Sequence, residues 1–243
     1  MVVTPYSNTT EGKKEQVEKM FNEIAHRYDF INQLLSFGIH KFWRRKTIRL
    51  LSTTLSTKNS ILLDVATGTA DFAIDSLLLN PEKIIGIDIA NDMLAVGKNK
   101  LINKNLSEKI ELIQANSEEL PFADNFFDAA TVGFGVRNFE NLEKGLLEVS
   151  RTLKKGSSFA ILEFSIPERF PMKQLYNMYL KYICPFLGRL ISKNPVAYNY
   201  LFESVEKFPH GEKLNAILLK SGFSSAVAYP QTFGIVTIYI AKK

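Results

Sequence analysis

Between residues 61 and 163 the sequence alternates short apolar runs with longer segments of helical periodicity, and this alternation constrains the fold most strongly. Short apolar runs bounded by small or polar residues are typical of strands that are buried on both faces of a sheet. Strands that alternate with helices form a parallel sheet that helices cover on both faces. We therefore predict an α/β fold with strands at 61–65, 83–87, 110–114, 127–132 and 159–163 and helices at 71–79, 91–101 and 142–153.

Two local signals refine these boundaries. Asn91 is the expected N-cap of the helix that runs to about residue 101, since asparagine is a favoured N-cap residue. Lys154, Lys155 and Gly156 predict a turn before the last parallel strand.

The alternation ends near residue 166, and the remaining elements are of a different kind. They are helices over 167–199 interrupted at Pro185 and Pro195, a helix over 211–221 ended by Gly222, and strands over 226–229 and 235–240. The connection between the last two strands is short and permits only an antiparallel pair. A mostly parallel seven-stranded sheet with a final antiparallel hairpin is the Rossmann-like arrangement of class I methyltransferases.

The N-terminal part precedes the sheet and reads as helical. Val17, Met20, Phe21, Ile24 and Tyr28 share one helical face, and a second amphipathic stretch surrounds the tryptophan at 43. We predict one domain over 1–243. Its parts are a helical cap (1–55), a cofactor-binding core (56–165), a helical substrate insertion (166–210) and a closing helix with antiparallel strands (211–243).

Composition narrows the class of protein. The chain is 46% hydrophobic, which excludes a disordered protein, and its net charge of +5 is mild. The single Cys184 excludes an internal disulfide and a cysteine-rich zinc site, and no metal is predicted. Residues 1–14 lack the apolar run of a signal peptide, and no run reaches the roughly 18 apolar residues of a membrane span. We expect a cytoplasmic protein that touches a membrane only from outside.

The turn after the first strand carries the first candidate ligand contacts. It contains Asp64, Ala66, Gly68, Thr69 and Asp71, and ligands in such folds bind at the carboxyl ends of the strands. A dinucleotide fingerprint would place glycine at 66, 68 and 71. Asp71 would repel a pyrophosphate, whereas S-adenosylmethionine (SAM) has no phosphate and carries a sulfonium and an ammonium group. The turn therefore favours SAM over a nicotinamide cofactor, although an ordinary tight turn would look similar.

Three further strand ends add polar groups. Asp88, twenty residues after Gly68, suits the ribose hydroxyls, although a surface or capping Asp would fit there too. Asn116 and Ser117, followed by Leu-Pro-Phe at 120–122, suit the adenine, although a plain turn is the alternative. Arg137 ends a glycine-containing loop where a guanidinium could stabilise a phenolate, or pair with a surface carboxylate.

At these residues the chain resembles the ubiquinone/menaquinone C-methyltransferase family over nearly its whole length. The most specific parts are the N-terminal Tyr-Asp, Asn and Trp-Arg set and the Phe-Gly-Val-Arg-Asn loop. The matching residues are Met20, Phe21, Ala25, Tyr28, Asp29, Asn32, Ser36, Gly38, Trp43, Arg44, 63–66, Gly68, Thr69, Asp71, 114–116, 120–122, 124–128, 134–138, 162–165, 200–201, 203–205, 208–209 and 222–223.

The resemblance implies SAM contacts at Thr69, Asp88, Asn116 and Ser117. The chain departs from the family at Ala70, where glycine is usual, so that one methyl group is added beside the cofactor. It also departs at 133, where some members have a SAM-contacting serine, and at Ser117, where alanine is more usual and the contact is expected through the backbone.

The implied acceptor is a reduced demethylmenaquinone with a polyprenyl tail. Attack on the SAM methyl group needs an electron-rich carbon, which a hydroquinone that loses a phenolic proton supplies. We expect Arg137 to stabilise the phenolate and Asn138 to orient the hydroxyl. Tyr28, His40 and Tyr200 are the candidate bases, and the sequence leaves the choice open.

The tail and the surface suggest partners. The apolar stretch 175–187 suits a prenyl groove, a bilayer interface or simply a packed cap. Residues 40–46 mix cations with aromatics and suit anionic lipid, through Arg44, Arg45 and Lys46. A homodimer is an open expectation, and no nucleic-acid partner is expected, since basic residues are dispersed. The rival hypotheses are a SAM enzyme for a ubiquinone precursor, sterol, lipid or small phenol, a nicotinamide oxidoreductase, and an RNA- or membrane-binding module.

Overall fold

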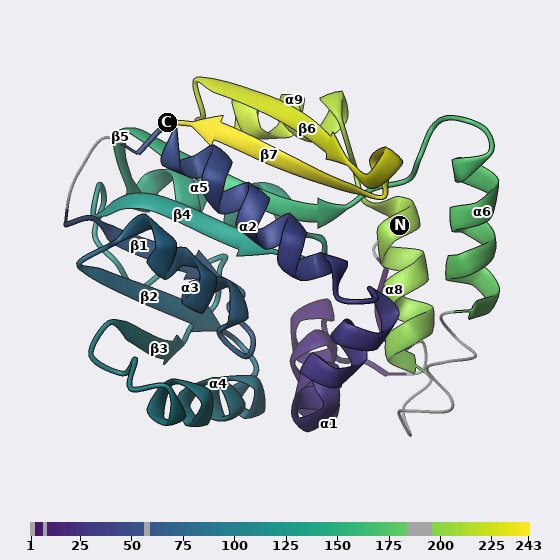
Figure 1. Cartoon of the computed structure of the whole chain (residues 1–243), viewed down its shortest axis with the longest axis horizontal. Helices are drawn as coiled ribbons and strands as arrows, with labels where there is room; N and C mark the ends of the chain where they lie inside the picture. Colours follow the sequence, from purple (N-terminus) through teal and green to yellow (C-terminus); the bar gives the residue numbers. More distant parts are fainter. Residues whose placement is uncertain (1–2, 7–8, 56–58, 184–195) are drawn as a thin grey trace.

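The computed structural model describes residues 3–6, 9–55, 59–183 and 196–243. It centres on a seven-stranded sheet in the order β3-β2-β1-β4-β5-β7-β6, with β7 antiparallel to both its neighbours (Figure 1). The strands are β1 (Ile61–Val65), β2 (Lys83–Asp88), β3 (Ile110–Gln114), β4 (Phe127–Gly133), β5 (Leu153–Phe164), β6 (Ser225–Gln231) and β7 (Val236–Lys242). The predicted class I methyltransferase fold is confirmed.

Helices and short helical turns make up most of the remaining described residues. They are α1 (Lys13–Leu35), α2 (Ile39–Ser52), α3 (Asp71–Ser76), η1 (Leu77–Leu79), α4 (Asn91–Asn103), η2 (Val136–Asn138), α5 (Leu142–Thr152), α6 (Met172–Met178), the π-turn η3 (Tyr179–Ile183), α8 (Val196–Lys207), α9 (Glu212–Lys220) and η4 (Thr232–Gly234).

Each face of the sheet has its own helices because successive strand residues point to opposite faces. Leu62 of β1 belongs to the cluster formed with α2, α3 and α4, and its neighbour Leu63 to the cluster formed with α5 and α9. Ala129 and Ala130 of β4 divide in the same way. The strands are therefore apolar on both sides, as the continuous apolar runs of the sequence predict.

Two local predictions are wrong. Asn91 is the first residue of α4, and Ala90 occupies the N-cap, without a capping side chain. Residues 154–156 do not separate α5 from the strand, because β5 already begins at Leu153. The pairing with β4 shifts there, from Phe127 opposite Leu153 to Ala129 opposite Ser158, and Gly156 has a φ of 80°. The residues form an irregularity within the strand.

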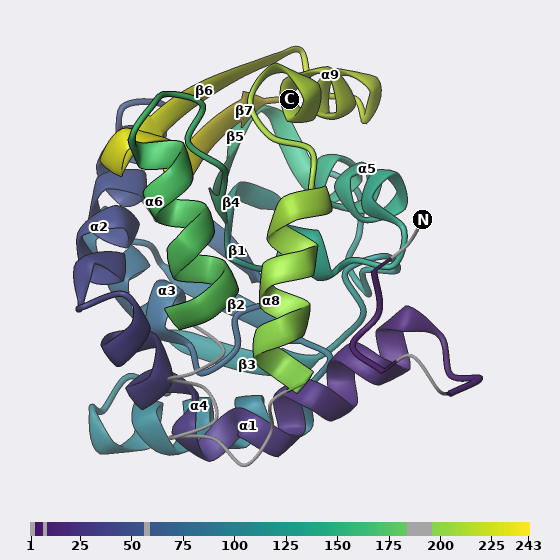
Figure 2. The ribbon, with the colours of Figure 1, turned by 90° about the vertical axis from the view of Figure 1, so that its right-hand side faces the viewer.

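The cap lies over the carboxyl ends of the parallel strands. Figure 2 shows α6 and α8 side by side in front of that edge, with α1 below them. Tyr200 of α8 packs against Val17 and Met20 of α1, and the Tyr179 hydroxyl donates to the carbonyl of Leu35. The predicted helices in 167–199 are thus present as α6, η3 and the start of α8, while Pro185, Pro195 and Cys184 lie outside the described residues.

Candidate active site

Two adjoining cavities open at the carboxyl edge of the sheet. The larger has a volume of about 430 Å³ and the smaller of about 70 Å³. Both are lined by the same six residues: Phe21, Tyr28, Ala66, Gly68, Gly133 and Phe134. We call these six residues the shared wall. It brings together the turn after β1, the end of β4 and one face of α1.

The smaller cavity holds the polar groups that the sequence predicts for ribose and adenine. Asp88, Asn116 and Ser117 line it from the ends of β2 and β3. Asp88 accepts hydrogen bonds from the backbone N–H of Gly68 at 2.8 Å and of Ala90 at 2.9 Å, one on each carboxylate oxygen. Each oxygen keeps a lone pair for a hydroxyl donor. Burial raises the pKa of this carboxyl, which the two N–H groups oppose.

The turn after β1 approaches the cavities with its backbone. Ala66, Gly68 and Ala70 all have φ values between 50° and 66°, the left-handed region that favours glycine. Ala70 is fully buried, so the departure from the family's glycine is accommodated at a conformational cost of about 1–2 kcal/mol. Ala66 and Gly68 remain in the wall of both cavities.

Asp64 lies beneath this turn and lines neither cavity. Its two oxygens accept hydrogen bonds from the hydroxyls of Thr67 and Thr131, both at 2.6 Å. Burial raises its pKa to about 6. Asp64 therefore links the turn that follows β1 to strand β4, a supporting position that differs from the predicted contact with the cofactor.

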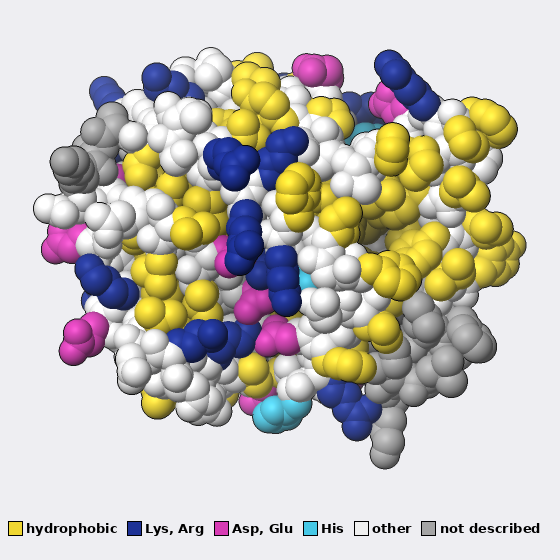
Figure 3. Space-filling model, viewed as in Figure 1, with side chains coloured by type: hydrophobic (Ala, Val, Ile, Leu, Met, Phe, Trp, Pro, Cys, Tyr) yellow, Lys and Arg dark blue, Asp and Glu magenta, His cyan; other side chains and the backbone are white. Residues whose placement is uncertain are grey.

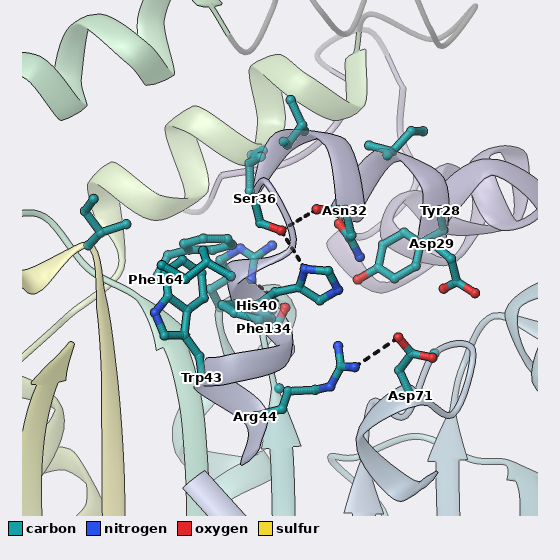
Figure 4. A pocket seen from close by; sticks show the side chains of 18 of the residues that line it. Tyr28, Asp29, Asn32, Ser36, His40, Trp43, Arg44, Asp71, Phe134 and Phe164 are labelled. Atoms are coloured by element: carbon teal, nitrogen blue, oxygen red, sulfur yellow. Dashed lines mark hydrogen bonds and ion pairs between the residues drawn. The ribbon is translucent and has the colours of Figure 1, made fainter. Parts of the chain in front are cut away.

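Thr69 and Asp71 line the larger cavity and belong to a charged network. The Thr69 hydroxyl donates to Asp29 of α1 at 2.6 Å. Lys100 of α4 bridges Asp29 at 2.7 Å and Asp71 at 2.6 Å. Arg44 of α2 lies 3.3 Å from Asp71 and 2.6 Å from Asp75 (Figure 4 shows the Asp71 contact).

This network changes the expectation for Asp71. Burial opposes its ionisation, but Lys100 and Arg44 together hold its pKa below the usual value. Its negative charge is thus already matched by side chains of the protein. The network also contains one more carboxylate than cation, since Asp29, Asp71 and Asp75 face Lys100 and Arg44.

Arg137 and Asn138 lie in η2, directly after β4. Arg137 lines the larger cavity and Asn138 the smaller. The Arg137 guanidinium pairs with the fully buried Glu163 at 2.7 Å, donates to the Phe134 carbonyl and stacks on Phe164 at 5.4 Å. The sequence left open that Arg137 pairs with a surface carboxylate. Arg137 does pair with a carboxylate, but this carboxylate is buried. Burial raises the pKa of Glu163 and Arg137 opposes that rise.

Two polar atoms of this turn keep hydrogen-bonding capacity. Arg137 Nε and Asn138 Oδ1 are buried and have no hydrogen-bond partner among the described residues. Buried polar atoms without partners are uncommon and point to an absent ligand or water. The turn thus contains one unused donor, on a residue of the larger cavity, and one unused acceptor, on a residue of the smaller cavity.

Lys13 supports this turn, and sequence reasoning missed it. Its Nζ donates to the carbonyls of Arg137 at 2.9 Å and Phe139 at 2.7 Å. Burial, aided by the Arg137 charge, lowers its pKa to about 8. A lone lysine in a polar N-terminal segment carries no signal that would separate it from a solvated residue.

All three candidate bases line the larger cavity. Burial raises the pKa of Tyr28 and of Tyr200, so both remain phenols at neutral pH and suit hydrogen-bond donation. The Tyr200 hydroxyl is buried without a hydrogen-bond partner among the described residues. Burial and the neighbouring Arg44 lower the pKa of His40, which is therefore neutral at pH 7.

Most of the other residues that line the larger cavity are apolar. Part of the predicted prenyl surface lines it, namely Leu175, Tyr176, Tyr179 and Leu180, whereas Met178, Tyr182 and Ile183 are exposed. Phe186 and Leu187 lie outside the described residues. No helix in the described part of the chain is long and apolar enough to cross a membrane.

The fold is that of class I SAM-dependent methyltransferases, with Asp88 at the end of β2 in the smaller cavity and a second cavity across the shared wall. The model of the ubiE/COQ5 methyltransferase family matches residues 9–243, and the chain belongs to that family. The resemblance noted from the sequence is thereby confirmed.

Several bacterial relatives are similar over almost their full length. A demethylmenaquinone methyltransferase of Bacteroides fragilis is 48% identical, with 99% of this chain and 97% of the relative covered. One of Porphyromonas gingivalis is 41% identical, covering 99% and 98%. A ubiquinone/menaquinone biosynthesis C-methyltransferase of Geobacter sulfurreducens is 38% identical, covering 99% and 93%.

Solved structures agree on the fold. A SAM-dependent methyltransferase of Thermotoga maritima, described as a possible histamine N-methyltransferase, superposes with a TM-score of 0.62 at 16% identity, covering 93% of this chain and 99% of that one. A putative SAM-dependent methyltransferase of Methanococcus maripaludis gives a TM-score of 0.60 at 16% identity, covering 98% and 97%. At this identity the likeness shows the fold alone.

Proposed function

We propose that this chain transfers the methyl group of SAM to a ring carbon of demethylmenaquinol. The observation that carries the proposal is the shared wall, which separates a small cavity that contains Asp88, Asn116 and Ser117 from a larger cavity that extends under the cap. The names of the relatives in Bacteroides and Porphyromonas support the same acceptor.

The smaller cavity suits the adenosyl part of SAM. Asp88 would accept hydrogen bonds from the ribose hydroxyls, and Asn116 with Ser117 would contact the adenine. The glycines of the shared wall, Gly68 and Gly133, leave room for the methyl group to meet the second cavity. When bound, SAM supplies an electrophilic methyl group on a cationic sulfur.

The larger cavity suits a quinol ring with an apolar tail. Arg137 and Tyr200 would hold the developing phenolate, because one brings a cation and the other a phenol that stays protonated. The apolar side chains of α6 and η3 would receive the first isoprene units. An oxidised quinone ring would fit the same walls, but its electron-poor carbon would not attack the methyl group.

A purified-enzyme assay tests the activity. With labelled SAM and chemically reduced demethylmenaquinone, we expect methylated product by mass spectrometry, and none with the oxidised quinone. A strain without this gene should accumulate demethylmenaquinone, and an unchanged quinone profile would refute the proposal. A ubiquinone precursor offered in the same assay distinguishes the two acceptors.

Arg137→Ala should separate turnover from cofactor binding. Arg137 faces the larger cavity, so we expect kcat to fall by about 10²-fold or more while SAM affinity stays nearly unchanged. Isothermal titration with SAM and a steady-state assay measure the two quantities. Wild-type turnover in this variant would exclude the role given to Arg137.

We further propose that the mouth of the larger cavity rests on a membrane surface. Three phenylalanines near the mouth are among the most exposed, Phe37 at 84%, Phe170 at 81% and Phe233 at 78%. Figure 3 shows apolar side chains gathered around a hollow, next to a band of Lys and Arg. Such an aromatic surface beside cations suits the interface of an anionic bilayer.

The structure corrects one residue of this expectation. Arg44 is buried and pairs with Asp71 and Asp75, so it cannot face lipid, whereas Lys41 and Arg45 are exposed on α2. Co-sedimentation with anionic vesicles should weaken in Phe37→Ser combined with Phe233→Ser, and in Lys41→Glu combined with Arg45→Glu. Unchanged co-sedimentation of both double variants would refute the contact. Self-association remains a prediction that sedimentation velocity can test.

A further inference from the structure

His40 lies in a chain of hydrogen bonds at the junction of α1 and α2. Ser36 follows the last residue of α1, and His40 is the second residue of α2. The Ser36 hydroxyl donates to the Asn32 carbonyl at 2.6 Å and lies 2.5 Å from His40 Nδ1. Gly38, with a φ of 77°, makes the tight connection that folds these residues together.

This geometry fixes the tautomer of the imidazole. Two oxygens 2.6 Å apart need a hydrogen between them, since their lone pairs would otherwise repel. The single Ser36 hydrogen therefore points to the Asn32 carbonyl, and His40 Nδ1 must carry the hydrogen of the second contact. In the neutral ring Nε2 is consequently an unprotonated acceptor.

The ring faces the cavity that takes the acceptor. His40 lines the larger cavity although it is only 7% exposed. Figure 4 shows its ring turned toward the same space as the side chains of Asn32 and Tyr28. No hydrogen-bond partner of Nε2 occurs among the described residues, so this nitrogen is free to receive a proton.

We propose that His40 is the general base of the methyl transfer, with Nε2 accepting the phenolic proton of the quinol and Ser36 as its positioning residue. This inference rests on the proposed function and resolves the choice between the three candidate bases. Tyr28 and Tyr200, which would have to ionise first to act as bases, serve as hydrogen-bond donors instead.

His40 Nε2 takes the phenolic proton, and the electron pair left on oxygen moves into the ring. The adjacent ring carbon forms a bond to the SAM methyl group while the bond from methyl to sulfur breaks, its electrons going to sulfur. The methylated carbon then loses its hydrogen to water as a proton, and the electron pair of that bond restores the aromatic ring and returns the negative charge to oxygen. His40 gives its proton back to this oxygen, so one proton is released to solvent per turnover.

Charges around the ring set the expected pH dependence. Burial, then Arg44 and Lys41 of the same helix, lower the pKa of His40, while Asp71 and Asp75 of α3 oppose them. The base form therefore dominates at neutral pH, and kcat should fall only as the pH drops below about 6.5, the ordinary histidine value. A tyrosine would have to lose its own proton before it could act as the base. With tyrosine as the base, kcat would instead fall already below about pH 10.

The test compares His40→Gln with two controls. His40→Gln should lower kcat by about 10²–10⁴-fold, and imidazole should restore part of the activity of His40→Ala. Tyr200→Phe should lower kcat but keep the fall in kcat at acidic pH. His26 is exposed, so His26→Gln should have the same kcat as wild type. Ser36→Ala should lower kcat less than His40→Gln and shift the acidic limb. SAM titration and thermal melts of each variant show that the fold and the cofactor site persist.

The outcomes separate this inference from the proposed function. If wild type methylates demethylmenaquinol and His40→Gln retains both its kcat and its acidic limb, His40 is not the base although the activity stands. If wild type itself does not methylate this acceptor, the proposed function fails first. Loss of SAM binding in His40→Gln together with lost activity would assign the residue a structural role and overturn the inference.

Discussion

Several non-glycine residues in or beside the cavities have left-handed backbone conformations. Ala66, Ala70 and Phe134 have φ values of 50°, 66° and 58°. Positive φ costs an L-residue about 1–2 kcal/mol, and such costs gather where function constrains the backbone. Ala66 and Phe134 also belong to the shared wall. The departure at Ala70 is readable from the sequence, but the conformation of Phe134 is not.

Asp64 gives a pH prediction at this scale. Folding raises its pKa from 3.8 to about 6, so the folded protein favours the protonated carboxyl. The free energy of unfolding is therefore highest below about pH 4 and decreases as the pH rises through 6. The loss amounts to about 3 kcal/mol. Asp64→Asn has no such titration, so urea unfolding should show the variant gaining on wild type by about that amount between pH 4 and 7. Asp88 and Glu163 are present in both proteins, so their effects on the pH dependence cancel in the comparison. If the free energy of unfolding changed with pH equally in both proteins, the raised pKa of Asp64 would be contradicted.

Gly133 gives a packing prediction. A Cβ at this position would lie 2.7 Å from the Phe72 ring, so the serine of other family members does not fit here without movement. We expect Gly133→Ser to destabilise by about 1–3 kcal/mol, as overpacked sites do. Phe72→Leu should relieve the crowding, so a double-mutant cycle by chemical denaturation should show favourable coupling of about 1 kcal/mol. Additive effects would show that the ring does not limit this position.

Sequence reasoning located cavity residues at strand ends but not their partners. Asp88, Asn116 and Arg137 line the cavities because strand ends in parallel sheets converge on one edge. Lys13 and Glu163 could not be found in the same way. Each acts on Arg137 across more than 25 residues of sequence, by a contact that only the packing of α1 and β5 creates.

At the scale of elements, one buried arginine joins α2 to α3, in addition to the apolar packing of α2 against the sheet. Arg44 joins α2 to α3 through Asp75 and Asp71, with its own side chain only 11% exposed. The sequence shows two adjacent arginines of equal appearance. Their difference arises from helix geometry, which turns Arg44 inward beside Trp43 and leaves Arg45 in solvent.

Exchanging each arginine for glutamine should separate them. Arg44→Gln leaves Asp75 without its cation, so we expect a loss of about 2 kcal/mol in the free energy of unfolding. Arg45→Gln should change it by less than about 0.5 kcal/mol. Guanidinium denaturation of both variants at one pH measures the difference. Equal effects would mean that the ion pairs to α3 add nothing.

The elements that the sequence predicts correctly are those with strong periodicity. The strands from β1 to β4 agree within one residue because uninterrupted apolar runs have no other stable place than a buried sheet. The start of β5 was missed because Lys154, Lys155 and Gly156 carry turn chemistry, yet they form an irregular part of a strand. Local composition cannot distinguish a turn between elements from a bulge within one.

At the scale of the whole molecule, the division of the chain into one domain remains a prediction. Hydrophobic contacts link α1, α6 and α8 to one another and α2 to β5 and β7, so the cap has no separate core of comparable size. Calorimetry should show a single transition whose measured and van't Hoff enthalpies agree. SAM at 100 times its Kd should add about 2.7 kcal/mol, and NADH nothing. A second transition that ignores SAM would reveal an independent cap.

The shared wall has a thermodynamic consequence. Phe21 and Tyr28 of α1 contribute to both cavities, so whatever positions them for one ligand positions them for the other. The two binding equilibria are then linked, and the factor by which bound SAM tightens the quinol site must equal the factor by which bound quinol tightens the SAM site. Substrate specificity in such an enzyme becomes a property of the pair, because a poorly fitting acceptor also tightens the SAM site less than a well-fitting one does.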